Sequence, residues 1–182
     1  EDYVFLRDLV KVSALAVAKA PDTESARTMG GFLNVLLGAE DALFVRAFRS
    51  LRVPVKAWRE ADPSPVTAAF GDYLVSLAYS GTFREVCCAL YVTEGVYLEW
   101  AGLLRKRGAR PGVRIYQEWL DIHSEEALGP TVRFLEGVVN GATRAEGPSL
   151  QRIFDQTCRY EAAFWDMAYE GDSPTTPSPS GR

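Results

Sequence analysis

Three acidic residues occupy positions where a helix would normally bury apolar side chains. At helical spacing Glu94 lies inside the apolar stripe Leu90, Tyr91, Tyr97, Leu98 and Ala101. Glu161 lies in the stripe Leu150, Phe154, Phe164 and Ala168, and Asp2 leads the stripe Phe5, Leu6 and Leu9. A buried carboxylate is costly unless it is paired, hydrogen-bonded or protonated. We therefore expect these acids to form a polar cluster in which one donates a proton and another accepts one.

The alternative for each acid is a structural ion pair with an arginine, or a place at the edge of its stripe. Three helices that each aim one acid inward favour a functional site, because helical bundles build such sites in their core. Tyr97 shares a face with Glu94, so its phenol is expected to orient the acid or to bind a ligand. His123 is the only histidine. A lone histidine is more often a packed residue than a catalyst.

The spacing of the ligand residues does not support metal chemistry. A di-iron carboxylate site in a bundle needs two Glu-x-x-His pairs, and Leu120 occupies the position three before His123. A Cys-x-x-Cys zinc pattern is absent from the sequence. We expect no metal and no cofactor. Cys158, three residues before Glu161, remains a candidate nucleophile with that acid as its base, although a buried structural role suits the cysteines better.

The composition bounds the class of protein. The chain has 182 residues, 47% of them hydrophobic and 24% charged, which is typical of one globular domain. Its net charge of −4 comes from interspersed acids and bases, so we expect no nucleic-acid partner and no membrane partner. Cys87, Cys88 and Cys158 are odd in number, and two of them are adjacent. This pattern argues against a disulfide framework and predicts a cytoplasmic protein.

Short breakers divide the chain into helical segments, and strand patterns are nearly absent. The predicted helices cover residues 1–19, 22–51, 65–79, 82–107, 113–127, 131–140 and 147–170, with a loop at 52–64. We therefore predict an all-α bundle of about seven helices in a single domain, residues 1–170. Residues 171–182 are rich in Pro, Ser and Thr, which predicts a disordered tail. The start EDYVFLRDLV has the pattern of a helix interior without a cap, so we expect a further N-terminal segment before it.

Four segments together resemble one known family. They are EDYVFLRDL, SGTFREVCCALYVTEGVYLEWAGLL, IYQEWLDIHSEEALGP and RYEAAFWDMAY. In order and spacing they resemble the TenA/thiaminase II family from Glu1 to about Tyr169. The resemblance implies the haem-oxygenase-like helical fold. It also implies a further N-terminal helix that this chain lacks.

The resemblance also implies a branch of that family. In the thiaminase branch a catalytic cysteine stands four residues before the tyrosine that Tyr97 matches, and that position is Thr93 here. The segment ALYVTEGVYLEWA, with Glu94, is similar to a branch in which a glutamate replaces the cysteine. That branch, widespread in plants, hydrolyses N-formyl-4-amino-5-aminomethyl-2-methylpyrimidine and the free amine to 4-amino-5-hydroxymethyl-2-methylpyrimidine. A small pyrimidine is therefore the expected substrate.

Family roles can be carried over by position. Asp2 matches an aspartate that hydrogen-bonds the pyrimidine ring, and Glu161 matches a general acid/base. His123 stands where the thiaminase branch has a pocket tyrosine. Phe5 and Phe70 also replace tyrosines, so they can stack on a ring but cannot donate a hydrogen bond. The expected site comprises catalytic Glu94 and Glu161, with substrate-binding Asp2, Phe5, Phe70, Tyr97 and His123.

Two rival functions remain open at the level of the sequence. One is a true thiaminase II, or an aminopyrimidine hydrolase, with a cysteine nucleophile such as Cys158. The other is a non-catalytic ligand-binding protein on the same fold, including a haem binder. The resemblance also implies a homo-oligomer, either a dimer or a tetramer.

Overall fold

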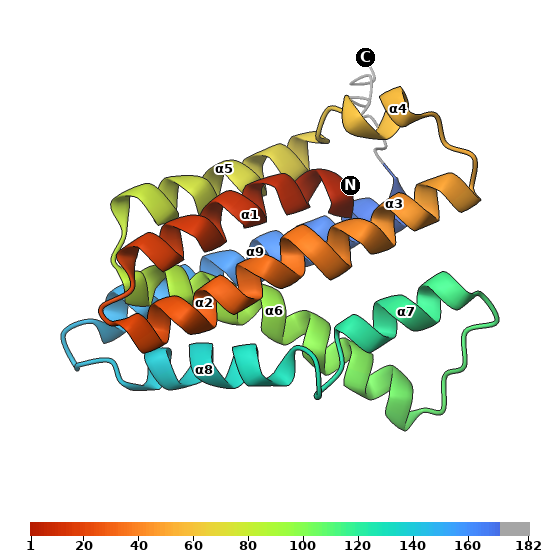
Figure 1. Ribbon diagram of the computed structural model, residues 1–182. Coiled ribbons are helices and arrows are strands. Elements are labelled where there is room, and N and C mark those ends of the chain that lie inside the picture. Colours follow the sequence, from red (N-terminus) through yellow and green to blue (C-terminus); the bar gives the residue numbers. More distant parts are fainter. Residues whose placement is uncertain (172–182) are drawn as a thin grey trace, which may run out of the picture.

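The computed structural model describes residues 1–171 of the chain, and the predicted tail at 171–182 lies, except for Gly171, outside the described residues. Figure 1 shows a bundle of helices, and no strand occurs within residues 1–171. The elements in order are α1 (Asp2–Lys19), α2 (Thr23–Val35), the π-helical turn η1 (Leu36–Glu40), α3 (Asp41–Ser50), α4 (Val55–Arg59), α5 (Pro65–Ser80), α6 (Phe83–Lys106), α7 (Arg114–Ile122), α8 (Gly129–Asn140) and α9 (Gly147–Glu170). The expected all-α class is therefore confirmed.

Side-chain caps define where several helices begin. The Asp22 carboxylate accepts a hydrogen bond from the Ser25 amide at the start of α2. Ser64 caps α5 in the same way, with Pro65 in its first turn. Thr82 forms a reciprocal capping box with Glu85 at the start of α6. These caps satisfy amide groups that a helix leaves unpaired at its N-terminus, which is why the sequence predicted these starts correctly.

Two segments differ from the expectation. The predicted loop at 52–64 contains the short helix α4, which is held by the Arg7 guanidinium through hydrogen bonds to the carbonyl oxygens of Trp58, Arg59 and Ala61. The predicted helix 113–127 ends earlier, at Ile122, so that His123 lies in the turn that follows α7. The first difference comes from contacts with a residue far away in the sequence. The second comes from a turn that the apolar pattern does not reveal.

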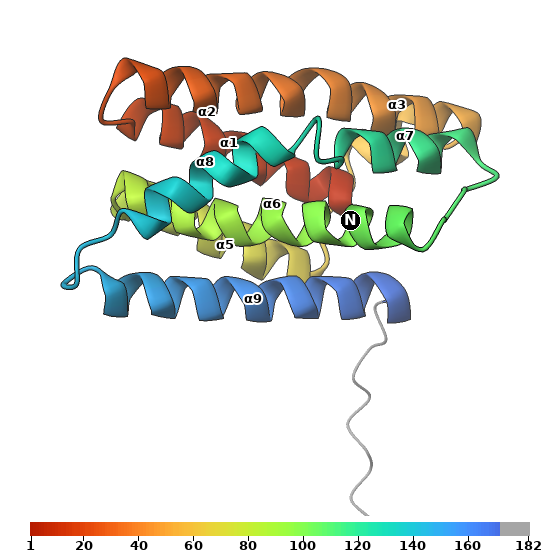
Figure 2. The same ribbon diagram turned by 90° about the horizontal axis from the view of Figure 1, so that it is seen from below.

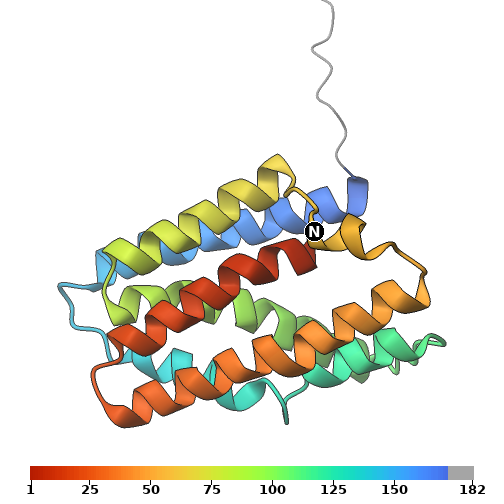
Figure 3. The same cartoon turned by 45° about the horizontal axis from the view of Figure 1, so that its top comes forward.

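The helices pack in an order that brings α1 next to the middle of α6. Figure 1 shows α1 and α5 side by side, and α1 also packs on α2 and α6. Figure 2 shows the α2–α3 helix along one side of the bundle and α9 along the opposite side, with α6 between them. Figure 3 shows the first residue at the end of the bundle where α4 and the last turn of α9 lie. This arrangement brings the first turn of α1 to the inward faces of α6 and α9.

One continuous helical segment, Thr23–Ser50, is long and apolar enough to cross a membrane by length and composition alone. In the fold, the segment packs against α1, and its middle part is a wall of the bundle. The apolar side chains that it buries are Met29, Phe32, Leu36 and Leu43. These four residues recur at helical spacing, as expected for one face of an amphipathic helix.

Candidate active site

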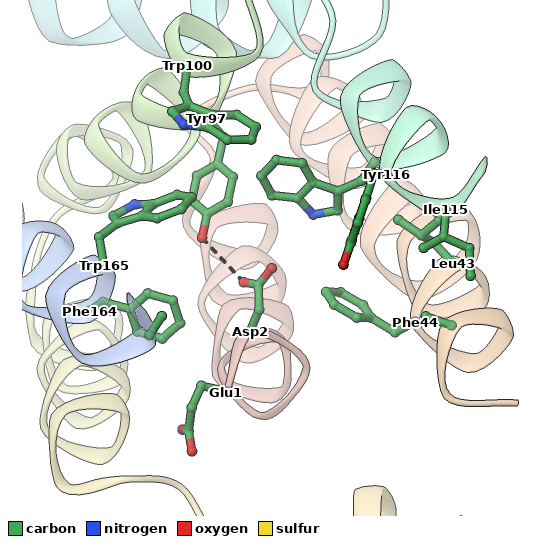
Figure 4. Close-up of a pocket in the computed structure, with 13 residues that line it drawn as sticks. Glu1, Asp2, Leu43, Phe44, Tyr97, Trp100, Ile115, Tyr116, Phe164 and Trp165 are labelled. Carbon is green, nitrogen blue, oxygen red and sulfur yellow. Dashed lines mark hydrogen bonds between the residues drawn. The ribbon is translucent and has the colours of Figure 1, made fainter. Parts of the chain in front are cut away.

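A hydrogen bond between α1 and α6 lies at the centre of the candidate site. The Tyr97 hydroxyl donates to Asp2 Oδ1 over 3.3 Å, joining residues that are 95 positions apart. Figure 4 shows this pair between aromatic rings that come from several helices. The neighbouring Glu1 carboxylate points away from the rings and accepts hydrogen bonds from Ser64 and Thr67 instead. Asp2 and Tyr97 line two cavities, one large and one small.

The larger cavity has a volume of about 510 Å³ and is mainly aromatic. Its walls are formed by Glu1, Asp2, Leu43, Phe44, Ala47, Tyr97, Trp100, Ile115, Tyr116, Trp119, Phe164, Trp165 and Ala168. The Trp100 and Trp119 rings meet edge to face with centroids 4.8 Å apart, and Trp165 lies 5.5 Å from the Tyr97 ring. Such walls suit a planar aromatic ligand with few polar groups. We call this space the aromatic cavity.

The smaller cavity has a volume of about 20 Å³, which is room for about one water molecule. It is lined by Asp2, Phe5, Leu9, Glu40, Thr93, Glu94, Tyr97 and His123. We call it the acid chamber, because three of its eight lining residues carry carboxylates. Asp2 and Tyr97 therefore form the boundary between a site for a ring and a site for one small polar group.

Glu94 is buried in the wall of the acid chamber, with 7% of its surface exposed. Its Oε1 accepts a hydrogen bond from the Thr93 hydroxyl at 3.2 Å. Burial raises the pKa of Glu94 from 4.5 to about 8, and the negative charge of Asp2 adds to the rise although the Thr93 bond opposes it. At neutral pH Glu94 therefore carries a proton that it can donate.

Glu161 on α9 is also buried, with 4% of its surface exposed, but it lines neither cavity. Among residues 1–171, neither of its carboxylate oxygens has a partner with hydrogen-bond geometry, although the nearby indole of Trp165 opposes the rise in its pKa. The pKa of Glu161 is raised to about 8, mainly by burial and in part by the charges of Glu94 and Asp2. Glu161 and Glu94 are therefore two acids that hold protons within electrostatic reach of each other.

Asp2 differs from the two glutamates in its titration. Burial raises its pKa to about 6, and the hydrogen bond from Tyr97 limits the rise. At neutral pH Asp2 is mostly ionised, whereas Glu94 and Glu161 are mostly protonated. The structure thus brings the three predicted acids together and gives them different protonation states.

His123 lines the acid chamber from the turn that follows α7. Its Nδ1 lies 2.8 Å from the carbonyl oxygen of Trp119, and a carbonyl only accepts, so Nδ1 carries the hydrogen and Nε2 is left as an acceptor. Burial lowers the pKa of His123, which keeps the imidazole neutral at pH 7. Its ring packs 5.1 Å from that of Tyr97.

The two predicted phenylalanines lie in different places. Phe5 lines the acid chamber and stacks on Phe70 with ring centroids 4.8 Å apart. Phe70 is 1% exposed, stacks on Tyr160 on its other side and lines neither cavity. Contact of Phe70 with a ligand stays a prediction, and in this structure its contacts are those of a core residue.

Sequence analysis missed Glu40, which enters the acid chamber from the π-helical turn η1. Burial raises its pKa well above the usual value, and the charges of Asp2 and Glu94 add to the effect. The signal was present, since Glu40 continues the stripe Met29, Phe32, Leu36 and Leu43 in the way that Glu94 interrupts its own. The aromatic residues of α7 were likewise not assigned to the site.

The cysteines lie away from both cavities. Burial raises the pKa of Cys87 to about 12 and that of Cys88 to about 11, and it also raises the pKa of Cys158. None of the three lines the aromatic cavity or the acid chamber. Within residues 1–171, no group of three or more His, Cys, Asp or Glu side chains is arranged to hold a metal ion.

Comparison with known proteins identifies related chains. The family model described as the TENA/THI-4/PQQC family matches residues 1–171. A Helicobacter pylori protein named aminopyrimidine aminohydrolase is 27% identical over 174 residues, which covers 93% of this chain and 80% of the relative. A protein of the same name from Halalkalibacterium halodurans is 25% identical over 173 residues, covering 93% and 77%. These names agree with the hydrolase activity expected from the sequence.

Solved structures share the fold. A TenA homologue from P. horikoshii OT3 superposes with a TM-score of 0.82 at 25% identity, covering 93% of this chain and 79% of the other. A TenA homologue from Pyrococcus furiosus gives 0.80 at 25% identity, covering 92% and 80%. These likenesses confirm the haem-oxygenase-like helical architecture and the family resemblance that the sequence motifs indicated.

Proposed function

The chain belongs to the TENA/THI-4/PQQC family, and from that premise we propose that it is a hydrolase of thiamin salvage acting on aminopyrimidines. The proposed reactions convert 4-amino-5-aminomethyl-2-methylpyrimidine, and its N-formyl derivative, to 4-amino-5-hydroxymethyl-2-methylpyrimidine. The main support is the acid chamber, where Asp2 and Glu94 line a space for one small group beside a cavity for an aromatic ring. The names of two bacterial relatives support the same reaction class.

The two cavities suggest how the substrate is oriented. The pyrimidine ring occupies the aromatic cavity, next to Tyr97 and Trp165. Asp2, which is mostly ionised, accepts hydrogen bonds from the amino-substituted edge of the ring. The substituted methylene then points past Asp2 and Tyr97 into the acid chamber, because these two residues border both spaces. The reacting carbon is thereby placed at Glu94.

The carboxylates can carry out hydrolysis of the amine without a covalent intermediate on the enzyme. The chamber holds one group of the size of ammonia or water, so the two occupy it in turn. The exocyclic nitrogen leaves from its protonated –NH3+ form, in which it binds or which it reaches by taking the proton of Glu94. Electron release from the ring amino group breaks the carbon–nitrogen bond, and the electron pair leaves with nitrogen as ammonia. Water then takes its place, bonds to the methylene carbon and gives a proton to a carboxylate. Glu94 lines the chamber that holds these groups. Glu161, which lies outside the chamber and feels the charge of Glu94, is assigned as the second acid.

The same groups serve the formyl substrate by amide hydrolysis. Water adds to the formyl carbon as a carboxylate takes its proton. The amine nitrogen leaves after it receives a proton from the other acid, which gives formate and the free amine. This proposal assigns the chain to the family branch in which Glu94 stands in place of a cysteine. Thr93, at the position of that cysteine, lines the acid chamber and has no nucleophilic thiol to offer.

The test is an assay of the purified chain on the amine, its formyl derivative and thiamin, measured side by side. We expect Glu161→Gln to lower kcat/KM on both aminopyrimidines by about 100-fold or more, in the range of a lost general acid or base. Cys158→Ala is the matched control on the same helix and is expected to keep the wild-type rate. A wild-type rate in Glu161→Gln would contradict the assignment. Loss of activity in Cys158→Ala, or cleavage of thiamin alone, would support a thiaminase with a cysteine nucleophile.

A further inference from the structure

Glu40 is a partly buried acid in the wall of the acid chamber that the proposed reaction does not yet use. It is the last residue of the π-helical turn η1, and such turns occur frequently at functional sites. Its side chain lines the acid chamber together with residues of α1 and α6. Within residues 1–171, Glu40 takes part in none of the ion pairs or side-chain hydrogen bonds that the structure contains. Its carboxylate is therefore available to a ligand.

Three other polar side chains of the chamber, Tyr97, Thr93 and His123, have their hydrogens engaged. Tyr97 donates its hydroxyl hydrogen to Asp2, and Thr93 donates to the Leu90 carbonyl or to Glu94. His123 donates from Nδ1 to the Trp119 carbonyl. The second oxygen of Asp2 and Nε2 of His123 are open acceptors. Glu40 and Glu94, whose pKa values burial raises, become further acceptors once a nearby cation favours their ionised forms. Among the described residues, no lysine or arginine lines either cavity to balance negative charge there.

A ligand that suits such a chamber is small, rich in donors and positively charged. A protonated primary amine carries three N–H donors and no acceptor, as the ammonium group of lysine does. An N-formyl group is larger, has one N–H donor and adds a carbonyl acceptor, which would face carboxylates. A space of about 20 Å³ accommodates the first group and not the second without movement of the walls.

We propose that Glu40 is a specificity-determining residue that contacts the charged aminomethyl group and makes the site prefer the free amine to its neutral N-formyl derivative. The inference rests on the proposed function and refines it. The cation would also favour ionisation of the surrounding carboxylates, because an opposite charge stabilises the charged form of an acid. Amine binding should therefore release protons from the groups that face the chamber, which are Asp2, Glu40 and Glu94, and from nearby Glu161. Tyr97 and His123 also face the chamber, and both are neutral. Burial raises the pKa of the Tyr97 hydroxyl and lowers the pKa of the His123 imidazole.

The decisive experiment compares both substrates on Glu40→Gln, with Glu24→Gln as the matched control. Glu24 lies on the same continuous helix, is exposed and is remote from both cavities. We expect Glu40→Gln to lower kcat/KM for the amine by about 10- to 100-fold, mainly through KM, as for the loss of one charge-assisted hydrogen bond. The value for the formyl derivative should change less than about threefold, a contrast that a purely structural defect would not produce. Equal losses on both substrates, or no loss on the amine, would overturn the proposal.

Binding measurements separate this inference from the proposed function. Calorimetry in the Glu161→Gln background, with two buffers of different ionisation enthalpy, gives the affinity and proton release for the amine and for the hydroxymethyl pyrimidine. We expect tighter binding of the amine with release of protons, and loss of both features in Glu40→Gln. Glu40→Asp keeps the charge and should restore part of the preference. If the wild type hydrolyses neither substrate, the proposed function fails, yet these binding data still decide whether Glu40 selects a cation.

Discussion

Replacing Glu94 with glutamine is expected to stabilise the fold at neutral pH even as it removes activity. Glutamine has nearly the same shape but cannot ionise. The wild-type carboxyl has a pKa of about 8 in the folded protein and an ordinary value of 4.5 when unfolded. A raised pKa in the folded state favours folding fully below pH 4.5, and this contribution is lost as the pH rises through 8. Glu94→Gln has no carboxyl at this position, so its free energy of unfolding should not fall for this reason as the pH rises.

The size of the effect follows from linkage. Between pH 5 and pH 7 the unfolded chain ionises Glu94 whereas the folded chain keeps its proton, so the folded state is penalised by roughly 2 to 3 kcal/mol over that interval. This is a large part of the 5 to 15 kcal/mol, approximately, by which domains are usually stable. The wild-type free energy of unfolding should therefore fall clearly from pH 5 to pH 7. In Glu94→Gln the fall should be smaller by about the same 2 to 3 kcal/mol.

The assay is urea unfolding followed by circular dichroism at pH 5, 6, 7 and 8. The matched control is Glu99→Gln, which removes an exposed carboxyl from the same helix and should leave the pH dependence unchanged. Equal m-values in the three proteins would show that the change lies in stability and not in the unfolded state. If wild type and Glu94→Gln kept parallel pH profiles, Glu94 would not be a buried acid with a raised pKa, and the reasoning would be refuted.

Three further outcomes are expected from the same structure. Tyr97→Phe removes the hydrogen bond that limits the pKa of Asp2, so the acid limb of the kcat/KM profile should move to higher pH; an unmoved limb would contradict the role of this bond. The single histidine, His123, should titrate below pH 6.5 in NMR spectra because burial lowers its pKa, and titration above that value would show an exposed ring. Phe70→Ala should lower the free energy of unfolding by about 3 to 5 kcal/mol, since its ring is fully packed between Phe5 and Tyr160. If Phe70→Ala instead raised KM strongly and changed the free energy of unfolding little, Phe70 would be in contact with the substrate.

The helices were largely predictable because the signals for them are local. Apolar residues at helical spacing, capping side chains such as Thr82, and prolines such as Pro65 act within a few residues of their position. α4 was missed because its end is held by Arg7, which lies about 50 positions earlier in the chain. The early end of α7 was missed because Leu120 and Ile122 keep the apolar pattern up to its last residue, and no glycine or proline marks the turn at His123.

The acids of the site were predictable to a similar degree. Glu94 and Glu161 interrupt apolar stripes, and a stripe on a helix predicts which side chains point inward whatever the helix packs against. Glu40 offered the same signal within a less regular segment, where the π-helical turn changes the period. The family motifs then pointed to a reaction class that the residue pattern by itself left open.

By itself, the sequence determined that this chain is helical and that several of its helices aim acids inward, because helical periodicity is a short-range property. Only the tertiary structure decided which acids share a chamber, which are protonated and which stays behind the cavity walls. Asp2 and Tyr97 meet across 95 positions, and Asp2 raises the pKa values of both Glu40 and Glu94 only because three helical segments converge. Burial and mutual repulsion of charges depend on distances in space, which no spacing along the chain encodes.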